Sequence, residues 1–166
     1  MSDDPEHEPG EICVRGMNVM QGYYKNPAAT ENVLDKEGWL KTGDMGTRSP
    51  DGTLFLRGRS KTMILSASGQ NIYPEEIESK LNNMPFVAES LVVERDGRLV
   101  ALVYPDYEAV DRLGISGADL QSAMENVRRE LNGLLAPYEQ VSKIQLVPNE
   151  FEKTPKRSVK RFLYTQ

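Results

Sequence analysis

The sequence has one cysteine, few aromatic residues and no long hydrophobic run. A single cysteine, Cys13, excludes an internal disulfide and a cysteine-based zinc site. Cys13 lies in the apolar stretch Ile12-Cys13-Val14, which favours a small buried side chain over a reactive thiol. No apolar stretch approaches the roughly 20 residues that a membrane-spanning helix requires. We therefore expect no membrane span.

The chain also lacks a surplus of positive charge. Its net charge of −5 argues against nucleic acid as the main partner, because binding to phosphates depends on excess Lys and Arg. The start, MSDDPEHEPGEI, is acidic and has neither the basic leader nor the apolar core of a secretory signal. We expect these first residues to be solvated and the protein to be cytoplasmic.

The first third of the 166 residues predicts a small β-rich unit. GEICVRG alternates as a strand does, and Asn26-Pro27 predicts a helix over roughly 27–34. The turn Ser49-Pro50-Asp51-Gly52 predicts a β-hairpin-like unit over residues 38–58. So short a segment buries too little surface to offset its chain entropy. We expect it to belong to something larger.

From Arg59 onward the pattern predicts a compact α+β domain. A helix begins at Pro74, and the strands VAESLVVE and RLVALVYP are joined by a turn at Arg95-Asp96-Gly97. A longer helix begins near Ser116, and a strand is expected near 143–147. The apolar stripe of the longer helix consists of Leu120, Met124, Val127, Leu131 and Leu134. We place the domain boundary at Gly58-Arg59, which gives domains 1–58 and 59–166.

Three short motifs could meet a polar ligand: Asp44 after Gly43, Arg59 after Gly58, and the loop around Gly69. Each is ambiguous alone, because Asp44 could cap a turn, Arg59 could be an exposed strand end, and Gly69 could supply a positive φ.

Their order is more informative. Six segments follow one another in the order of the last blocks of adenylate-forming enzymes: GEICVRG, GYYKNPAAT, GWLKTGDMG, DGTLFLRGRSKTMI, SGQNIYPEEIE and KTPKRSVKR. From Gly10 to about Leu163 the chain resembles the superfamily of acyl-CoA synthetases, peptide-synthetase adenylation domains and luciferases. The resemblance implies the small C-terminal domain of these enzymes, a short mixed β-sheet with flanking helices, preceded by a β-rich remnant of the large N-terminal domain.

The resemblance also implies an activity for the parent protein: fatty acid, ATP and CoA give acyl-CoA, AMP and pyrophosphate, with Mg²⁺ on the phosphates. GQNIYPEEIE and KRFLY are similar to the versions in bacterial long-chain enzymes. The phosphate loop, the adenine-binding block and the acyl pocket of the family have no counterpart in this sequence. We therefore expect the isolated chain to be inactive, to bind ATP weakly at best, and to hold no metal ligand.

Residue roles follow from the same resemblance. Asp44 would accept hydrogen bonds from the ribose hydroxyls of the nucleotide, and Arg59 would face the nucleotide. Lys61 is at the hinge around which the small domain swings between its adenylating and thioester-forming states. The backbone around Ser68, Gly69 and Gln70 would line the pantetheine channel in the second state. Glu75 and Glu76 follow Pro74 in a first helical turn, where we interpret them as structural.

The tail departs from the family pattern Lys-Thr-x-x-Gly-Lys-Ile-x-Arg, whose second lysine reaches the substrate carboxylate and the α-phosphate. Lys153-Thr154 and Val159-x-Arg161 fix a register that puts Arg157 at the glycine and Ser158 at the lysine. Three explanations stay open: Lys156 or Lys160 substitutes, adenylation is impaired, or the register is wrong by two. We favour a substitute lysine, Lys156.

Other functions stay open at this point. A peptide-synthetase-type adenylation domain is the nearest alternative within the superfamily. A non-catalytic lipid-binding or regulatory module is another, because residues 150–161 carry five basic and two acidic side chains beside Phe162 and Tyr164. The bland interpretation is that Phe162, Leu163 and Tyr164 pack in a last helical turn. The sequence gives no expectation for the oligomeric state.

Overall fold

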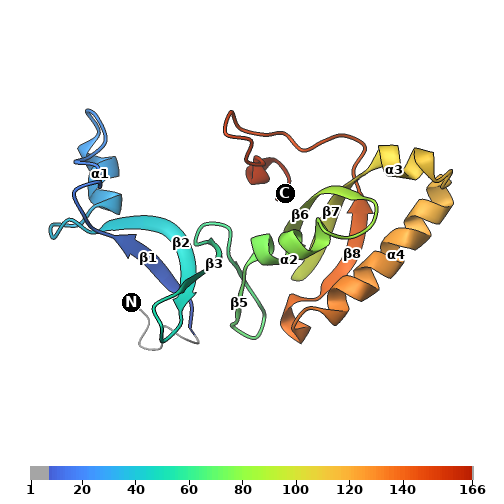
Figure 1. The fold of residues 1–166 in the computed structure, drawn as a ribbon, viewed down its shortest axis with the longest axis horizontal. Coiled ribbons are helices and arrows are strands. Elements are labelled where there is room, and N and C mark those ends of the chain that lie inside the picture. Colours follow the sequence, from blue (N-terminus) through green and yellow to red (C-terminus); the bar gives the residue numbers. More distant parts are fainter. Residues whose placement is uncertain (1–7, 166) are drawn as a thin grey trace. The chain divides into compact units, whose positions relative to one another are not determined.

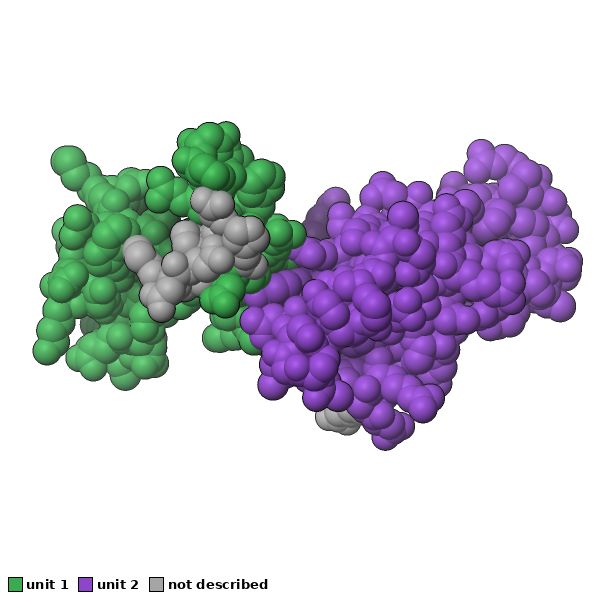
Figure 2. All heavy atoms as spheres, turned by 90° about the horizontal axis from the view of Figure 1, so that it is seen from below, with its two compact units in different colours: residues 1–63 green, residues 64–166 purple. Residues whose placement is uncertain are grey.

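The structure, a computed structural model, describes residues 8–165. The predicted acidic lead-in lies outside the described residues over positions 1–7. The chain divides into two compact units, residues 1–63 and 64–166, which Figure 2 shows in different colours. This division falls a few residues after the predicted boundary at Gly58-Arg59.

The first unit contains a three-stranded antiparallel sheet in the order β1-β2-β3 and one short helix. The strands are β1 (Gly10–Val14), β2 (Leu40–Arg48) and β3 (Leu54–Arg59), and the helix is α1 (Pro27–Val33). The Asn26 side chain accepts a hydrogen bond from the Ala29 N–H at 3.0 Å, which caps the helix. The predicted helix and hairpin are therefore confirmed.

This unit has almost no core. Among its described residues only Gly46 and Thr47 are buried. Three apolar side chains of β3 are exposed by half or more: Leu54 by 55%, Phe55 by 52% and Leu56 by 72%. Apolar surface on this scale normally meets another protein surface. The unit is thus as poor in buried surface as its length predicts.

The second unit is built on a mixed three-stranded sheet. In it β6 (Val87–Arg95) pairs antiparallel with β7 (Arg98–Pro105), and β7 pairs parallel with β8 (Val141–Leu146). The remaining elements are a short hairpin, three α-helices and two 3-10 turns (Figure 1): β4 (Ile64–Leu65), β5 (Asn71–Ile72), α2 (Pro74–Leu81), α3 (Tyr107–Arg112), α4 (Gly117–Gly133), η1 (Pro137–Glu139) and η2 (Arg161–Leu163).

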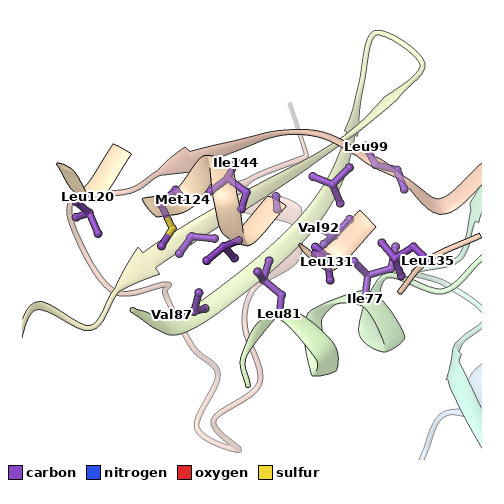
Figure 3. Close-up of a cluster of buried hydrophobic side chains, with 14 of the residues drawn as sticks. Ile77, Leu81, Val87, Val92, Leu99, Leu120, Met124, Leu131, Leu135 and Ile144 are labelled. Carbon is purple, nitrogen blue, oxygen red and sulfur yellow. The ribbon is translucent and has the colours of Figure 1, made fainter. Parts of the chain in front are cut away.

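Both faces of this sheet are covered. On one face α2 and α4 bury a large apolar cluster that includes Ile77, Val92 and Leu131 (Figure 3). On the other face the chain after β8 places Phe151 and Tyr164 against β6 and β7, their rings edge to face at 5.1 Å. Successive strand residues point to opposite faces, so each of the two strands serves both clusters.

The helix α4 begins where the sequence predicts, with the Ser116 hydroxyl accepting from the Asp119 N–H at 3.3 Å. The predicted apolar stripe is wrong at its last member. Leu134 is 60% exposed, and Leu135 is buried instead. Because α4 ends at Gly133, Leu134 is its C-cap, and the helical spacing no longer applies there.

Two further expectations concern the tail and the membrane. The expected packing of the last turn is wrong for Phe162 and Leu163, which are exposed, whereas Tyr164 packs on Phe151. Within residues 8–165, no helix has both the length and the apolar character to span a bilayer.

Candidate functional site

Asp44 and Arg59 face each other across β2 and β3. They are register partners, and Arg59 Nη1 donates to Asp44 Oδ1 at 2.6 Å. The side chains are 37% and 55% exposed, so solvent screens the pair and its contribution to stability is small. Both charges lie within reach of a ligand in solution.

A glycine gives this pair its backbone setting. Gly43 has a φ of 75°, a left-handed conformation that disfavours other residues. Its carbonyl accepts the Ser60 N–H at 2.9 Å, and its own N–H donates to Glu11 Oε1 at 3.0 Å. These bonds tie β1, β2 and the end of β3 together beside Asp44.

A groove of about 770 Å³ opens in the first unit beside this pair. Thr42, Gly43, Arg59 and Lys61 line it together with residues of β1 and α1. A pocket of this volume lies within the range typical of small-molecule sites. The first unit thus has a groove with three cationic side chains on its wall, Lys41, Arg59 and Lys61, and one carboxylate, Glu11.

Lys61 lies in a tight turn that follows β3. The N–H groups of Thr62 and Met63 donate to the Arg59 carbonyl at 3.1 and 3.2 Å. The Lys61 side chain is exposed, and the first compact unit ends at Met63. The predicted hinge residue is therefore part of the short segment that joins two separately packed units.

The loop of Ser68, Gly69 and Gln70 is the turn of the β4–β5 hairpin. Gly69 has a φ of 84°, and its N–H donates to the Ser66 carbonyl at 2.9 Å. A Cβ at Gly69 would meet nothing within 4 Å, so conformation rather than crowding favours glycine here. The Gln70 side-chain oxygen accepts from the hydroxyls of Ser66 and Ser68, which holds the loop in shape.

This loop also borders a groove of the second unit. The groove has a volume of about 380 Å³ and is lined by Ser66 and Ser68, by Arg98 at the β6–β7 turn and by Tyr138 of η1. Gly69 and Gln70 do not line it. Of the three predicted loop residues, Ser68 is the one that lines this groove.

Lys156 and Ser158 lie at the exposed tip of a hairpin in the tail. Lys153 pairs antiparallel with Val159 as an isolated bridge. Within this bridge the Thr154 N–H donates to the Ser158 carbonyl, and the Arg157 N–H to the Thr154 carbonyl, both at 2.8 Å. The tip thus consists of residues 155–158.

Sequence reasoning missed Glu78, which is buried within α2. Its Oε1 accepts the Val92 N–H at 2.6 Å, and its Oε2 accepts from Arg161 Nη2. Burial raises the pKa of Glu78 to about 7, although the hydrogen bonds from Arg161 and Val92 act to lower it. Arg161 also lies 3.5 Å from Glu75. The sequence signal that could have indicated this burial is the position of the carboxylate between Ile77 and Leu81, on the apolar side of α2.

Comparison with known proteins gives relatives in sequence and in structure. No family model matches the chain. Long-chain-fatty-acid–CoA ligase 1 of Homo sapiens is 39% identical over an alignment of 158 positions, which covers 86% of this chain and 23% of the relative. Probable 4-coumarate–CoA ligase 3 of Dictyostelium discoideum is 49% identical over 86 residues, 52% of this chain and 15% of the relative. The chain therefore spans less than a quarter of the length of these relatives.

Solved structures agree with these sequence relatives. O-succinylbenzoate coenzyme A synthetase of Bacillus subtilis, solved with AMP, matches 97% of this chain and 31% of its own, with 29% identity and a TM-score of 0.74. The adenylation domain of a carboxylate reductase from Mycobacterium chelonae matches 97% of this chain and 26% of its own, with 25% identity and a TM-score of 0.80. In sequence and in fold, this chain therefore belongs with the AMP-forming acyl-CoA ligases among the adenylate-forming enzymes, and it corresponds to one part of them.

Proposed function

We propose that this chain is the C-terminal part of an ATP-dependent, AMP-forming fatty acid CoA ligase. The parent protein would convert fatty acid, ATP and CoA to acyl-CoA, AMP and pyrophosphate. The long-chain class is favoured because the human relative at 39% identity is a long-chain-fatty-acid CoA ligase. Residues 1–58 would form the last part of the large ATP-binding domain, and residues 59–166 would be the mobile domain.

The pairing of Asp44 with Arg59 is the observation that carries this proposal. An ionised carboxylate offers strong acceptors to the two hydroxyls of a ribose, and a guanidinium suits a phosphate. The two side chains lie on neighbouring strands, only 2.6 Å apart, beside the groove of the first unit. This spacing is compatible with one nucleotide that meets both groups.

The turn at Lys61 suits a hinge. The second unit has its own apolar clusters, and neither includes a residue of the first unit. A change of backbone angles near Lys61 would therefore leave the packing of the mobile domain intact. Such a swing would exchange the adenylating state for the thioester-forming state, in which the loop at Ser68, Gly69 and Gln70 would turn toward the CoA thiol.

The tail hairpin supports the register of the family motif. Arg157, at the position of the motif's glycine, has a φ of 62°, the left-handed conformation that glycine adopts most readily. Ser158 then stands at the position of the catalytic lysine. Lys156, the substitute favoured from the sequence, is exposed at the same tip beside Arg157, and a cation there would take over charge stabilisation in adenylation.

Mg²⁺ would accompany ATP in the parent protein, but we assign it no ligand in this chain. Over residues 8–165, no three or more His, Cys, Asp or Glu side chains come together in a way that could hold a metal ion. The mechanism proposed for these residues concerns the ribose, the phosphates and the hinge alone.

A chimera tests the proposal directly. The part of the human long-chain ligase that aligns with this chain is replaced by residues 10–166, and acyl-CoA formation from palmitate, ATP and CoA is measured. We expect acyl-CoA and AMP in equal amounts, whereas this chain alone gives none and binds ATP weakly in isothermal titration. A folded chimera that forms no acyl-CoA, or a micromolar dissociation constant for ATP with the isolated chain, would contradict the proposal.

The lipid-binding alternative has some support from the exposed Phe162 and Leu163. Against it, three of the five basic side chains in the tail are paired with carboxylates: Lys153 with Glu89, Lys160 with Glu152, and Arg161 with Glu78. Co-sedimentation with vesicles of anionic lipid at low salt tests this alternative, which requires the chain to pellet with the vesicles. No pelleting would exclude it.

A further inference from the structure

Arg157 stands out in the tail hairpin because its backbone is left-handed. With a φ of 62°, it adopts a conformation that is unfavourable for a residue with a Cβ. The side chain is exposed, and in the described part of the chain no carboxylate lies within ion-pair distance of its guanidinium. Neither packing nor an ion pair therefore accounts for arginine here, and strained residues cluster at functional sites.

Ion pairs hold the hairpin at both ends. At its start, Lys153 contacts Glu89 of β6, and hydrogen bonding to Glu89 raises the pKa of Lys153. At its end, Arg161 contacts Glu78 of α2. The Lys160 N–H also donates to the Glu152 carbonyl at 2.8 Å across the base. The tip is therefore presented from a base that is fixed to the domain.

The fixed base leaves two cations at the tip. Lys156 and Arg157 are adjacent, exposed and without an acidic partner among the residues described, whereas the other three basic side chains of the tail are neutralised. Two adjacent cations at a hairpin tip form a local positive field that suits a phosphate. A planar guanidinium can in addition donate two parallel hydrogen bonds to one phosphate group.

We propose that Arg157 is a catalytic residue of the adenylation step, in which its guanidinium binds the α-phosphate of ATP. In this step a carboxylate oxygen of the fatty acid forms a bond to the α-phosphorus. The bond from that phosphorus to the bridging oxygen breaks, and pyrophosphate leaves with the electron pair. Negative charge on the α-phosphate oxygens is greatest between these events, and Arg157 offsets it. This assignment rests on the proposed function.

The assignment places the cation one residue before the motif's lysine position. Ser158 is neutral and short, so it cannot supply the charge, whereas Arg157 is its neighbour and has a longer side chain. Arginine adopts the left-handed backbone at this position less readily than glycine, but it contributes a positive charge. Lys156 would then be an auxiliary cation or a solvated one.

The first arm of the test uses the chimera of human ligase with residues 10–166. Arg157→Gly keeps the left-handed turn and removes the guanidinium. Asp96→Gly is the matched control, because Asp96 also has a left-handed φ, 51°, at the tip of another hairpin. Pyrophosphate exchange measures adenylation, and thioester formation from pre-made acyl-adenylate measures the second half-reaction.

We expect Arg157→Gly to lower pyrophosphate exchange at least about tenfold, with thioester formation and melting temperature unchanged or higher. Asp96→Gly should leave both half-reactions within about twofold. Replacing ATP with its α-thio analogue should slow the parent chimera more than the Arg157→Gly variant, because only the parent uses a contact to that phosphate. Exchange within about twofold of the parent for Arg157→Gly would overturn the assignment.

The second arm keeps the assignment testable if the chimera is inactive, an outcome that counts against the proposed function alone. In the human ligase, the two residues aligned with Arg157 and Ser158 are replaced by Arg-Ser or by Gly-Ser. We expect the Arg-Ser variant to exceed the Gly-Ser variant in pyrophosphate exchange by at least about tenfold. Equal rates for the two variants would refute a role of the guanidinium in adenylation.

Discussion

Arg161 donates a hydrogen bond to the carboxylate of Glu78, 83 positions earlier in the chain, and thereby joins the last turn of the tail to α2. The same carboxylate accepts the Val92 N–H of β6 at 2.6 Å. One buried acidic group thus connects a helix, the sheet and the tail. Because the hairpin of Lys156 and Ser158 lies just before Arg161, its position depends on this carboxylate.

Removing this carboxylate should destabilise the second unit. Glu78→Ala leaves the Val92 N–H and the Arg161 guanidinium without their acceptor in a mostly buried place. We expect a loss of about 3 kcal/mol in the free energy of unfolding, measured by urea titration with circular dichroism. Glu130→Gln, on the exposed face of α4, is the control and should change little. A loss below about 1 kcal/mol for Glu78→Ala would show that the carboxylate is not a structural link.

The pKa of Glu78 predicts how stability depends on pH. Burial raises this pKa from 4.5 to about 7, so the folded state binds the proton more tightly than the unfolded state. The stabilisation that the folded state gains from protonated Glu78 is therefore complete below the unfolded pKa, and it is lost as the pH rises through about 7. We expect the free energy of unfolding to fall between about pH 4.5 and pH 7, with a shallower dependence in Glu78→Gln. The same slope in both proteins would assign the effect to other groups.

Local sequence signals predicted much of this fold. Alternation and the Asp96-Gly97 turn predicted β6 and β7, and Ser116 predicted the start of α4, because each depends on residues close together in sequence. The parallel pairing of β8 with β7 was not predicted. It joins segments separated by the whole of α4, and a strand pattern does not specify its partner.

In the candidate site, too, the sequence predicted candidate residues but not the contacts between distant segments. Motif order predicted Asp44 and Arg59 as site residues, but their contact depends on the hairpin register, which shifts between Met45 and Gly46. Glu78 was missed because a helical Glu next to Glu75 and Glu76 has the pattern of a solvated helix start. The groups that compensate its burial, the Val92 N–H and Arg161, lie farther along the chain, and sequence spacing carries no information on those contacts.

The end of α4 provides a test of the corrected core. Leu131 is fully buried, whereas Leu134 is 60% exposed beyond the last helical residue. We expect Leu131→Ala to lower the free energy of unfolding by about 2–5 kcal/mol, and Leu134→Ala by less than about 0.5 kcal/mol. Urea titration of the two variants measures both. Comparable losses of unfolding free energy in the two variants would support the stripe predicted from the sequence, which includes Leu134, over the observed one.

Asp44 should matter more for activity than for stability. Its pairing with Arg59 is more than a third exposed on both sides, so Asp44→Asn should change the free energy of unfolding by less than about 1 kcal/mol. In the chimera the same substitution weakens acceptance of the ribose hydroxyls, and we expect kcat/KM for ATP to fall about tenfold or more. Glu31→Gln, exposed on α1, is the control. An unchanged kcat/KM for Asp44→Asn would remove Asp44 from the nucleotide site.

Ser158 and Lys156 decide what the altered tail motif does in adenylation. Ser158→Lys restores a cation at the motif's position, so we expect faster pyrophosphate exchange in the chimera. Lys156→Ala should lower the exchange if Lys156 is the substitute, while thioester formation from pre-made acyl-adenylate stays the same. Because both residues are exposed at the hairpin tip, neither change should disturb folding, which a melting curve verifies. If Lys156→Ala leaves the exchange unchanged and Ser158→Lys raises it, Lys156 is a solvated side chain and the tip's remaining cation is Arg157.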